Sequence, residues 1–85
     1  MWMLITVCDN DIDTDIVNTL ELAQEKMLEK ITNVFENNDR LDGMEDWRGE
    51  NWDTGDMYGW INYEVNYSEY SYKIVKLPSL VVDLL

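Results

Sequence analysis

Residues 15–37 read DIVNTLELAQEKMLEKITNVFEN, an unbroken stretch that contains neither glycine nor proline. Its apolar residues recur at the three- and four-residue spacings that place side chains on one face of an α-helix. The apolar residues assigned to this face are Ile16, Val17, Leu20, Ala23, Met27, Leu28, Ile31, Val34 and Phe35. The sequence therefore predicts an amphipathic helix over residues 14–37, about 35 Å long, with Asp13 or Thr14 as its N-cap.

Apolar segments on both sides of this helix predict β-strands. Residues 1–8 are apolar and partly β-branched, which predicts a central strand that is buried on both faces. Within residues 57–67, apolar or aromatic residues alternate with mainly polar ones. The turn-like segment YSEY then leads into a second predicted strand, residues 70–77. The sequence therefore predicts an antiparallel hairpin over residues 57–77, which Pro78 ends.

Together these elements predict one α+β domain over residues 1–85, in the order β-α-β-β. One long helix would pack on a three-stranded, mainly antiparallel sheet, with an acidic and aromatic loop over residues 38–56 and an apolar tail over residues 78–85. A chain this short buries only about 60–65% of its unfolded surface. The thin core, the open sheet edges and the tail favour a homodimer, with contacts at Leu80, Val82 and Leu85.

The net charge of −12 is unevenly distributed along the chain. Residues 9–56 contain 15 of the 18 acidic residues and 4 of the 6 basic residues. Such a field repels nucleic acid and anionic membranes and attracts basic protein surfaces. We therefore expect a basic protein as partner, and neither direct nucleic-acid binding nor membrane association.

Residue types that support catalysis are scarce. The sequence contains no histidine, and its only cysteine, Cys8, lies in a predicted core strand with no base beside it. No phosphate-binding or dinucleotide-binding motif is present. We expect a protein that is not an enzyme and binds no cofactor. A single cysteine permits no internal disulfide, and the first residues lack a signal peptide, so we expect a cytoplasmic protein.

The segment DNDIDTD places aspartates at positions 9, 11, 13 and 15, as the first half of an EF-hand loop does. Counted from Asp9, Thr14 stands where the loop needs glycine, and Leu20 stands where it needs glutamate. We therefore expect no metal site, and interpret the aspartates as a solvated helix start that complements the helix dipole.

Residues 41–60, LDGMEDWRGENWDTGDMYGW, combine acidic and aromatic residues on a glycine-broken backbone. One arginine, Arg48, cannot neutralise all the neighbouring acids. These acids are Asp42, Glu45, Asp46, Glu50, Asp53 and Asp56. Two roles fit the segment. In a binding loop, the acids would steer a basic partner and Trp47 and Trp52 would hold it. In a cover loop, both tryptophans would fold over the core.

A second acidic set lies on the predicted helix, where Glu21, Glu25 and Glu29 recur every four residues. It fits a solvated outer face that pairs with Lys26 and Lys30, or a mimic of nucleic-acid phosphates. Helical carboxylates at this spacing recur every ~6 Å, whereas one strand of B-DNA carries a charge every ~3.4 Å. The helix alone would therefore imitate DNA poorly, and the acids of residues 39–56 would have to supply the rest.

Two functions compete on this evidence. The first is a small acidic inhibitor, of a kind typical of phage or mobile-element accessory proteins, that engages a basic host protein such as one that handles nucleic acid. The second is an adaptor or assembly module whose contact is apolar and whose charge only gives solubility. A weaker third candidate is a Ca²⁺-dependent binding module.

Overall fold

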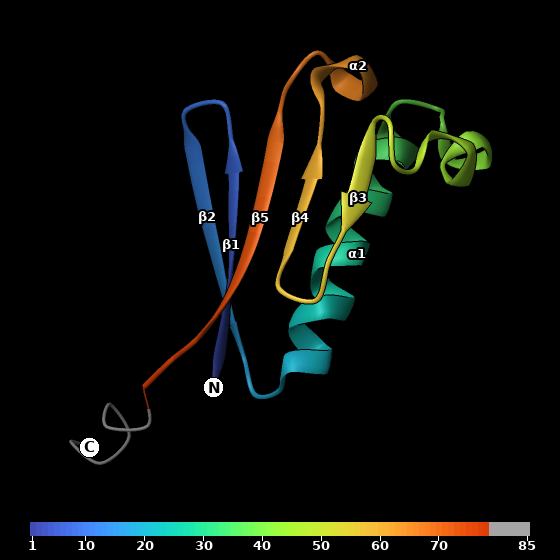
Figure 1. Ribbon diagram of the computed structural model, residues 1–85. Coiled ribbons are helices and arrows are strands. Elements are labelled where there is room, and N and C mark those ends of the chain that lie inside the picture. The colour runs from blue at the N-terminus through green and yellow to red at the C-terminus, as the bar shows by residue number, and fades with distance from the viewer. Residues whose placement is uncertain (79–85) are drawn as a thin grey trace.

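The structure of the chain is a computed structural model that describes residues 1–78. It has an α+β fold with a five-stranded antiparallel sheet and one long helix (Figure 1). The strands are β1 (Trp2–Cys8), β2 (Asp11–Val17), β3 (Trp52–Thr54), β4 (Tyr58–Ile61) and β5 (Tyr70–Lys76). They lie in the order β2-β1-β5-β4-β3. The predicted fold class and long helix are confirmed, whereas the predicted three-stranded sheet is wrong.

The first missed strand is β2, which forms a hairpin with β1 through a two-residue turn at Asp9 and Asn10. Its sequence, DIDTDIV, alternates between aspartates and β-branched residues, and this period of two suits a strand. The prediction that these aspartates form a helix start is therefore wrong.

The long helix, α1 (Leu20–Asn37), begins later than predicted because β2 occupies the preceding residues. Thr19, rather than Asp13 or Thr14, is its N-cap, and the Thr19 hydroxyl oxygen accepts a 3.1 Å hydrogen bond from the Leu22 N–H. At the other end, Asn38 Nδ2 donates a 2.7 Å bond to the Val34 carbonyl, which satisfies one of the last carbonyl groups.

The predicted hairpin over residues 57–77 is right in its pairing and wrong in its connection. Strands β4 and β5 pair antiparallel, with Ile61 opposite Tyr70. Residues that were predicted to continue the first strand instead form a short helix, α2 (Tyr63–Asn66). The Asn62 side chain starts this helix by accepting a 3.1 Å bond from the Glu64 N–H, and Tyr67 ends it in the left-handed conformation with φ 56°.

The predicted loop over residues 38–56 contains short regular elements. Two 3₁₀ helices, η1 (Leu41–Gly43) and η2 (Glu45–Trp47), follow the end of α1. Strand β3, at one edge of the sheet, then pairs with β4, with Trp52 opposite Ile61. Three residues are too few to show a sequence period, which is why the prediction missed β3.

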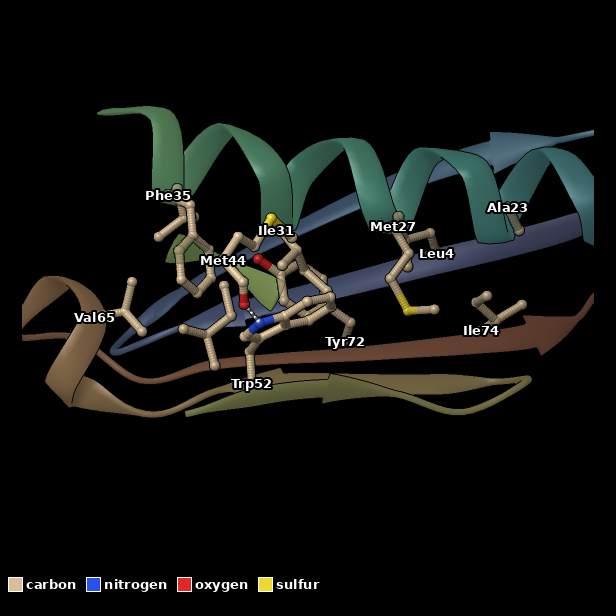
Figure 2. Close-up of a cluster of buried hydrophobic side chains, with 12 residues drawn as sticks. Leu4, Ala23, Met27, Ile31, Phe35, Met44, Trp52, Val65, Tyr72 and Ile74 are labelled. Carbon is tan, nitrogen blue, oxygen red and sulfur yellow. Dashed lines mark hydrogen bonds between the residues drawn. The ribbon is translucent and has the colours of Figure 1, made fainter. Parts of the chain in front are cut away.

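The hydrophobic core lies between α1 and one face of the sheet, as Figure 2 shows. Its largest fully buried side chains are Trp52, Tyr72, Phe35, Leu4 and Met27. Strand β1 has neighbours on both sides in the sheet, but only Leu4 among its residues is buried. The prediction that β1 is covered on both faces is therefore wrong.

Candidate binding surfaces

The sheet has a second face, which we call the open face and which points away from α1. Register defines it: Leu4, Tyr72, Ile74 and Ile61 are buried against α1, so the alternate residues of the same strands point the other way. Its apolar side chains come from four strands. They are Met3, Ile5, Val7, Ile12, Ile16, Tyr58, Trp60 and Val75.

Three of these apolar side chains are exposed within residues 1–78, and the other five are half-buried. Ile12, Ile16 and Tyr58 are 71%, 58% and 57% exposed. The helices of the described chain lie on the core side, since α1 packs against β1, β2 and β5, while α2 and η1 contact α1. Exposed apolar area that is contiguous in this way is typical of a surface that binds another molecule.

Charged groups are few on the open face. Among its strand residues, Lys73 on β5 and Asp53 on β3 are the charged ones. Asp53 accepts a 3.0 Å hydrogen bond from Arg48 Nε, and it also accepts one from the backbone N–H of Thr54. Those two bonds hold the pKa of Asp53 below its usual value, and the bond from Thr54 has the larger effect. The open face is thus close to neutral in a protein of net charge −12.

The acids that were predicted to form one partner-binding site are divided in space, and all of them except the half-buried Asp53 are exposed. Glu21, Glu25 and Glu29 are exposed along α1. Four others follow the C-terminal end of α1, around η1 and η2: Asp42, Glu45, Asp46 and Glu50. Asp56 lies near the opposite end, because Gln24 Nε2 donates a 2.8 Å bond to its carbonyl oxygen. Gln24 is about 20 Å along the helix axis from Asn37, so these acids do not form one compact site.

The two tryptophans of the predicted binding loop have different environments. Trp52 is fully buried, and Trp47 is half-buried with its ring edge-on to Phe35 at a centroid distance of 6.3 Å. Trp52 therefore cannot contact a partner while the chain is folded. For Trp52 the cover-loop alternative is correct, and its assignment as a binding residue is wrong.

The alternating aspartates of β2 have a structural partner on α1. Lys30 Nζ lies 3.2 Å from Asp13 Oδ2 and 3.3 Å from Asp15 Oδ2. Burial opposes the charge of Lys30, but the hydrogen bonds to both carboxylates outweigh it and raise the Lys30 pKa. Among residues 1–78, no group of three or more acidic, Cys or His side chains is arranged to hold a metal ion.

A hollow of about 570 Å³ lies where β1, β4 and β5 meet the turns at one end of the sheet. Three aromatic residues, Trp60, Tyr63 and Tyr70, and two carboxylates, Asp9 and Glu69, belong to its lining. Tyr70 Oη accepts a 2.7 Å bond from Asn66 Nδ2. Burial raises the pKa of Tyr70, and the nearby charge of Asp9 acts in the same direction. Neither the hollow nor the open face was predicted from the sequence.

One sequence signal could have located the open face. Ile12, Thr14 and Ile16 alternate with aspartates, and a strand with this pattern presents its isoleucines to one side only. The hollow gives no comparable signal, because its aromatic and acidic residues come from three separate parts of the chain.

Comparison with protein-family models, with curated proteins and with solved structures finds no match for this chain. No helix within residues 1–78 has both the length and the apolar character that a membrane crossing requires.

Proposed function

We propose that this chain is a small acidic protein-binding module, without catalytic activity, that holds a basic partner protein on its open face. The observation that supports this most is the partly exposed apolar surface formed by β2, β1, β5 and β4. Trp60 and Tyr58 lie on it, and large aromatic residues carry much of the energy of protein interfaces. A cytoplasmic location belongs to the same proposal and is consistent with the free thiol of Cys8.

The dimensions of the open face indicate the kind of contact. With strands about 4.8 Å apart and residues about 3.4 Å apart, four strands give a flat area of roughly 400 Å². A standard protein interface buries about 800 Å² on each partner. The open face alone therefore suits a weak or transient complex, unless the partner also covers the surrounding rim.

The acids give the partner its expected charge. Among residues 1–78, only Asp13, Asp15 and Asp53 form ion pairs, so the other carboxylates have no cationic partner there. Charges around an apolar contact accelerate association with an oppositely charged protein and add less to the lifetime of the complex. The proposal therefore assigns steering to the acids and holding to the open face.

A second candidate is the inhibitor of a nucleic-acid-handling protein, of the phage-accessory kind. The observation that favours it is the stripe of exposed Glu21, Glu25 and Glu29 on α1, none of which forms an ion pair within residues 1–78. If the chain is such an inhibitor, the partner would contact α1 rather than the sheet. The carboxylates would then bind the groups of the partner that otherwise bind nucleic-acid phosphates.

Two matched pairs of substitutions distinguish the candidates. Each variant is tested for binding to the same partner protein, which is first captured with the parent protein. Ile12→Lys with Ile16→Lys adds two charges to the open face. Leu22→Lys with Leu28→Lys adds the same two charges to the exposed side of α1, where these leucines are 45% and 46% exposed. The module proposal expects faster dissociation for the first pair only. Equal binding by the first pair and the parent would contradict it.

Charge reversal at Glu21, Glu25 and Glu29 tests the acids in the same kinetic assay. If they only steer, the triple Lys variant should associate more slowly, with a weaker dependence on salt and an unchanged dissociation rate. Faster dissociation would instead support the inhibitor candidate, because the carboxylates would then be part of the contact.

The predicted homodimer is a separate proposal. Its contact residues Leu80, Val82 and Leu85 lie outside the described residues. Light scattering at high micromolar concentration should give twice the chain mass of 10.1 kDa, and the mass of one chain would contradict the dimer. If the Ile16→Lys substitution dissociates the dimer, the second copy binds at the open face.

A further inference from the structure

We propose that the hollow at the end of the open face binds a single Lys or Arg side chain of the partner, an inference that rests on the proposed protein-binding function. The hollow combines aromatic walls with two carboxylates, Asp9 and Glu69, and none of its lining residues is basic. Its volume of about 570 Å³ is in the range of roughly 300–1,000 Å³ that is usual for binding pockets.

The strand register explains why a hollow exists here. Val7 on β1 and Trp60 on β4 both lie opposite Ser71 on β5, so the small serine is flanked by two larger side chains on the open face. The hollow then continues over the strand ends, where Asp9 follows β1 and Glu69 precedes β5. A side chain that enters from the open face would therefore meet Trp60 before it reaches the carboxylates.

The carboxylates of the hollow lack a cationic partner in the folded chain. Within residues 1–78, neither Asp9 nor Glu69 forms an ion pair. The nearest base on the same strand face is Lys73, two residues beyond Ser71, and it does not line the hollow. A cation from another molecule would thus find two carboxylates and no competing ammonium or guanidinium group in the hollow.

The other tryptophans of the chain show what Trp60 lacks. Arg40 lies 4.7 Å from the ring centroid of Trp47, Arg48 lies 4.8 Å from that of Trp52, and Lys76 lies 5.8 Å from that of Trp2. In the described part of the chain, Trp60 is the tryptophan without a basic group over its ring. Because a cation is attracted to the face of an indole ring, Trp60 is the ring left to receive one from a partner.

A second acidic hollow provides an internal comparison. It measures about 350 Å³ and is lined by Glu36, Asp39, Leu41 and Asp42, with no aromatic residue. If negative charge alone attracted the cation, this hollow would bind it too. The proposal requires both carboxylates and aromatic rings, and therefore expects binding at the first hollow only.

Titration of the ¹⁵N-labelled full chain with N-acetyl-arginine amide tests this directly, with the neutral citrulline analogue as the matched probe. We expect the Trp60 indole and Ser71 signals to shift and to saturate at millimolar concentrations of the arginine compound. The Asp42 signal should not shift, and the citrulline analogue should shift none of these signals. Asp9→Asn and Glu69→Gln should each raise the dissociation constant about two- to fivefold, and Trp60→Leu should do so by a similar factor. Asn tolerates the left-handed backbone of Asp9, whose φ is 53°.

The control variant is Asp42→Asn, which removes one charge from the second hollow and should leave the arginine titration unchanged. Equal shifts with citrulline, equal shifts at both hollows, or no shift at all would overturn the proposal. The protein-binding function is judged separately, by the open-face lysine variants. A partner that still requires the open face while arginine does not bind would refute the hollow alone.

Discussion

The indole Nε1 of Trp52 donates a 2.7 Å hydrogen bond to the backbone carbonyl of Met44 (Figure 2). Both residues are buried, and the bond connects β3 to the segment between η1 and η2. Phe35 packs edge-on against the Trp52 ring at a centroid distance of 6.0 Å. The acidic, aromatic segment thus turns Trp52 and Met44 into the core and leaves most of its carboxylates in water.

Replacing Trp52 should destabilise the fold rather than simply weaken a contact surface. Trp52→Ala removes a fully buried indole and leaves the Met44 carbonyl without its donor, so we expect the free energy of unfolding to fall by about 3–5 kcal/mol. Urea denaturation measures this loss. Trp60→Ala, on the open face, is the matched control and should cost much less. Equal losses for both variants would contradict the placement of the two rings.

The Lys30 ion pairs should make a small, salt-sensitive contribution. Lys30→Met leaves Asp13 and Asp15 without their cation, and we expect a loss of about 0.5–1 kcal/mol because Asp13 is largely exposed. Since folding raises the Lys30 pKa, this contribution is complete below the usual lysine pKa of about 10.4 and is lost as pH rises through the raised value. Chemical denaturation at pH 8 and pH 11 checks both statements.

Lys26→Met serves as the control for Lys30, because Lys26 forms no ion pair within residues 1–78. Comparable losses for the two variants, or a Lys30→Met loss that high salt does not reduce, would argue against the contacts with β2.

Alkaline pH should destabilise the fold through Tyr72. This residue is 2% exposed, and its burial raises the pKa of the hydroxyl above the usual value. The folded chain therefore keeps a proton that the unfolded chain loses above pH ~10, so the free energy of unfolding declines as pH increases beyond that point. Tyr72→Phe should flatten this decline, whereas Tyr67→Phe, at an 82% exposed site, should leave it unchanged.

A methyl group at Gly59 should fit only if its neighbours shift. A Cβ there would lie 3.1 Å from Met27 Sδ and 3.4 Å from the Asp53 carbonyl oxygen, and Gly59 is buried beneath α1. We expect Gly59→Ala to cost about 1–3 kcal/mol in urea denaturation. Gly43→Ala, where the nearest atom is 3.7 Å away, should cost less. An unchanged midpoint for Gly59→Ala would mean that Met27 moves aside freely.

Local patterns predicted α1 and the pairing of β4 with β5, because a helix face and a strand face each leave a period in the sequence. The strand β2 was missed although its period is present, because its aspartates were interpreted as a helix start. The position of Trp52 depends on Phe35 and Met44, which come from other elements, so no local pattern contains it. Nor could apolar Met3, Ile5 and Val7 reveal that each of them is only half-buried within residues 1–78.

The pairing of β1 with β5 has a consequence for how the chain folds as it is synthesised. Trp2 lies opposite Lys76. Of the described strands, β1 is synthesised first and β5 last, so this pairing forms only after β5 has been made. Until residue 76 leaves the ribosome, β1 can pair only with β2, and β4 also lacks its neighbour on one side. Contacts between residues so distant in sequence slow folding, because loop closure precedes any gain from them. The nascent chain would therefore expose both faces of its first hairpin during translation, and it would complete its sheet only after β5 has emerged.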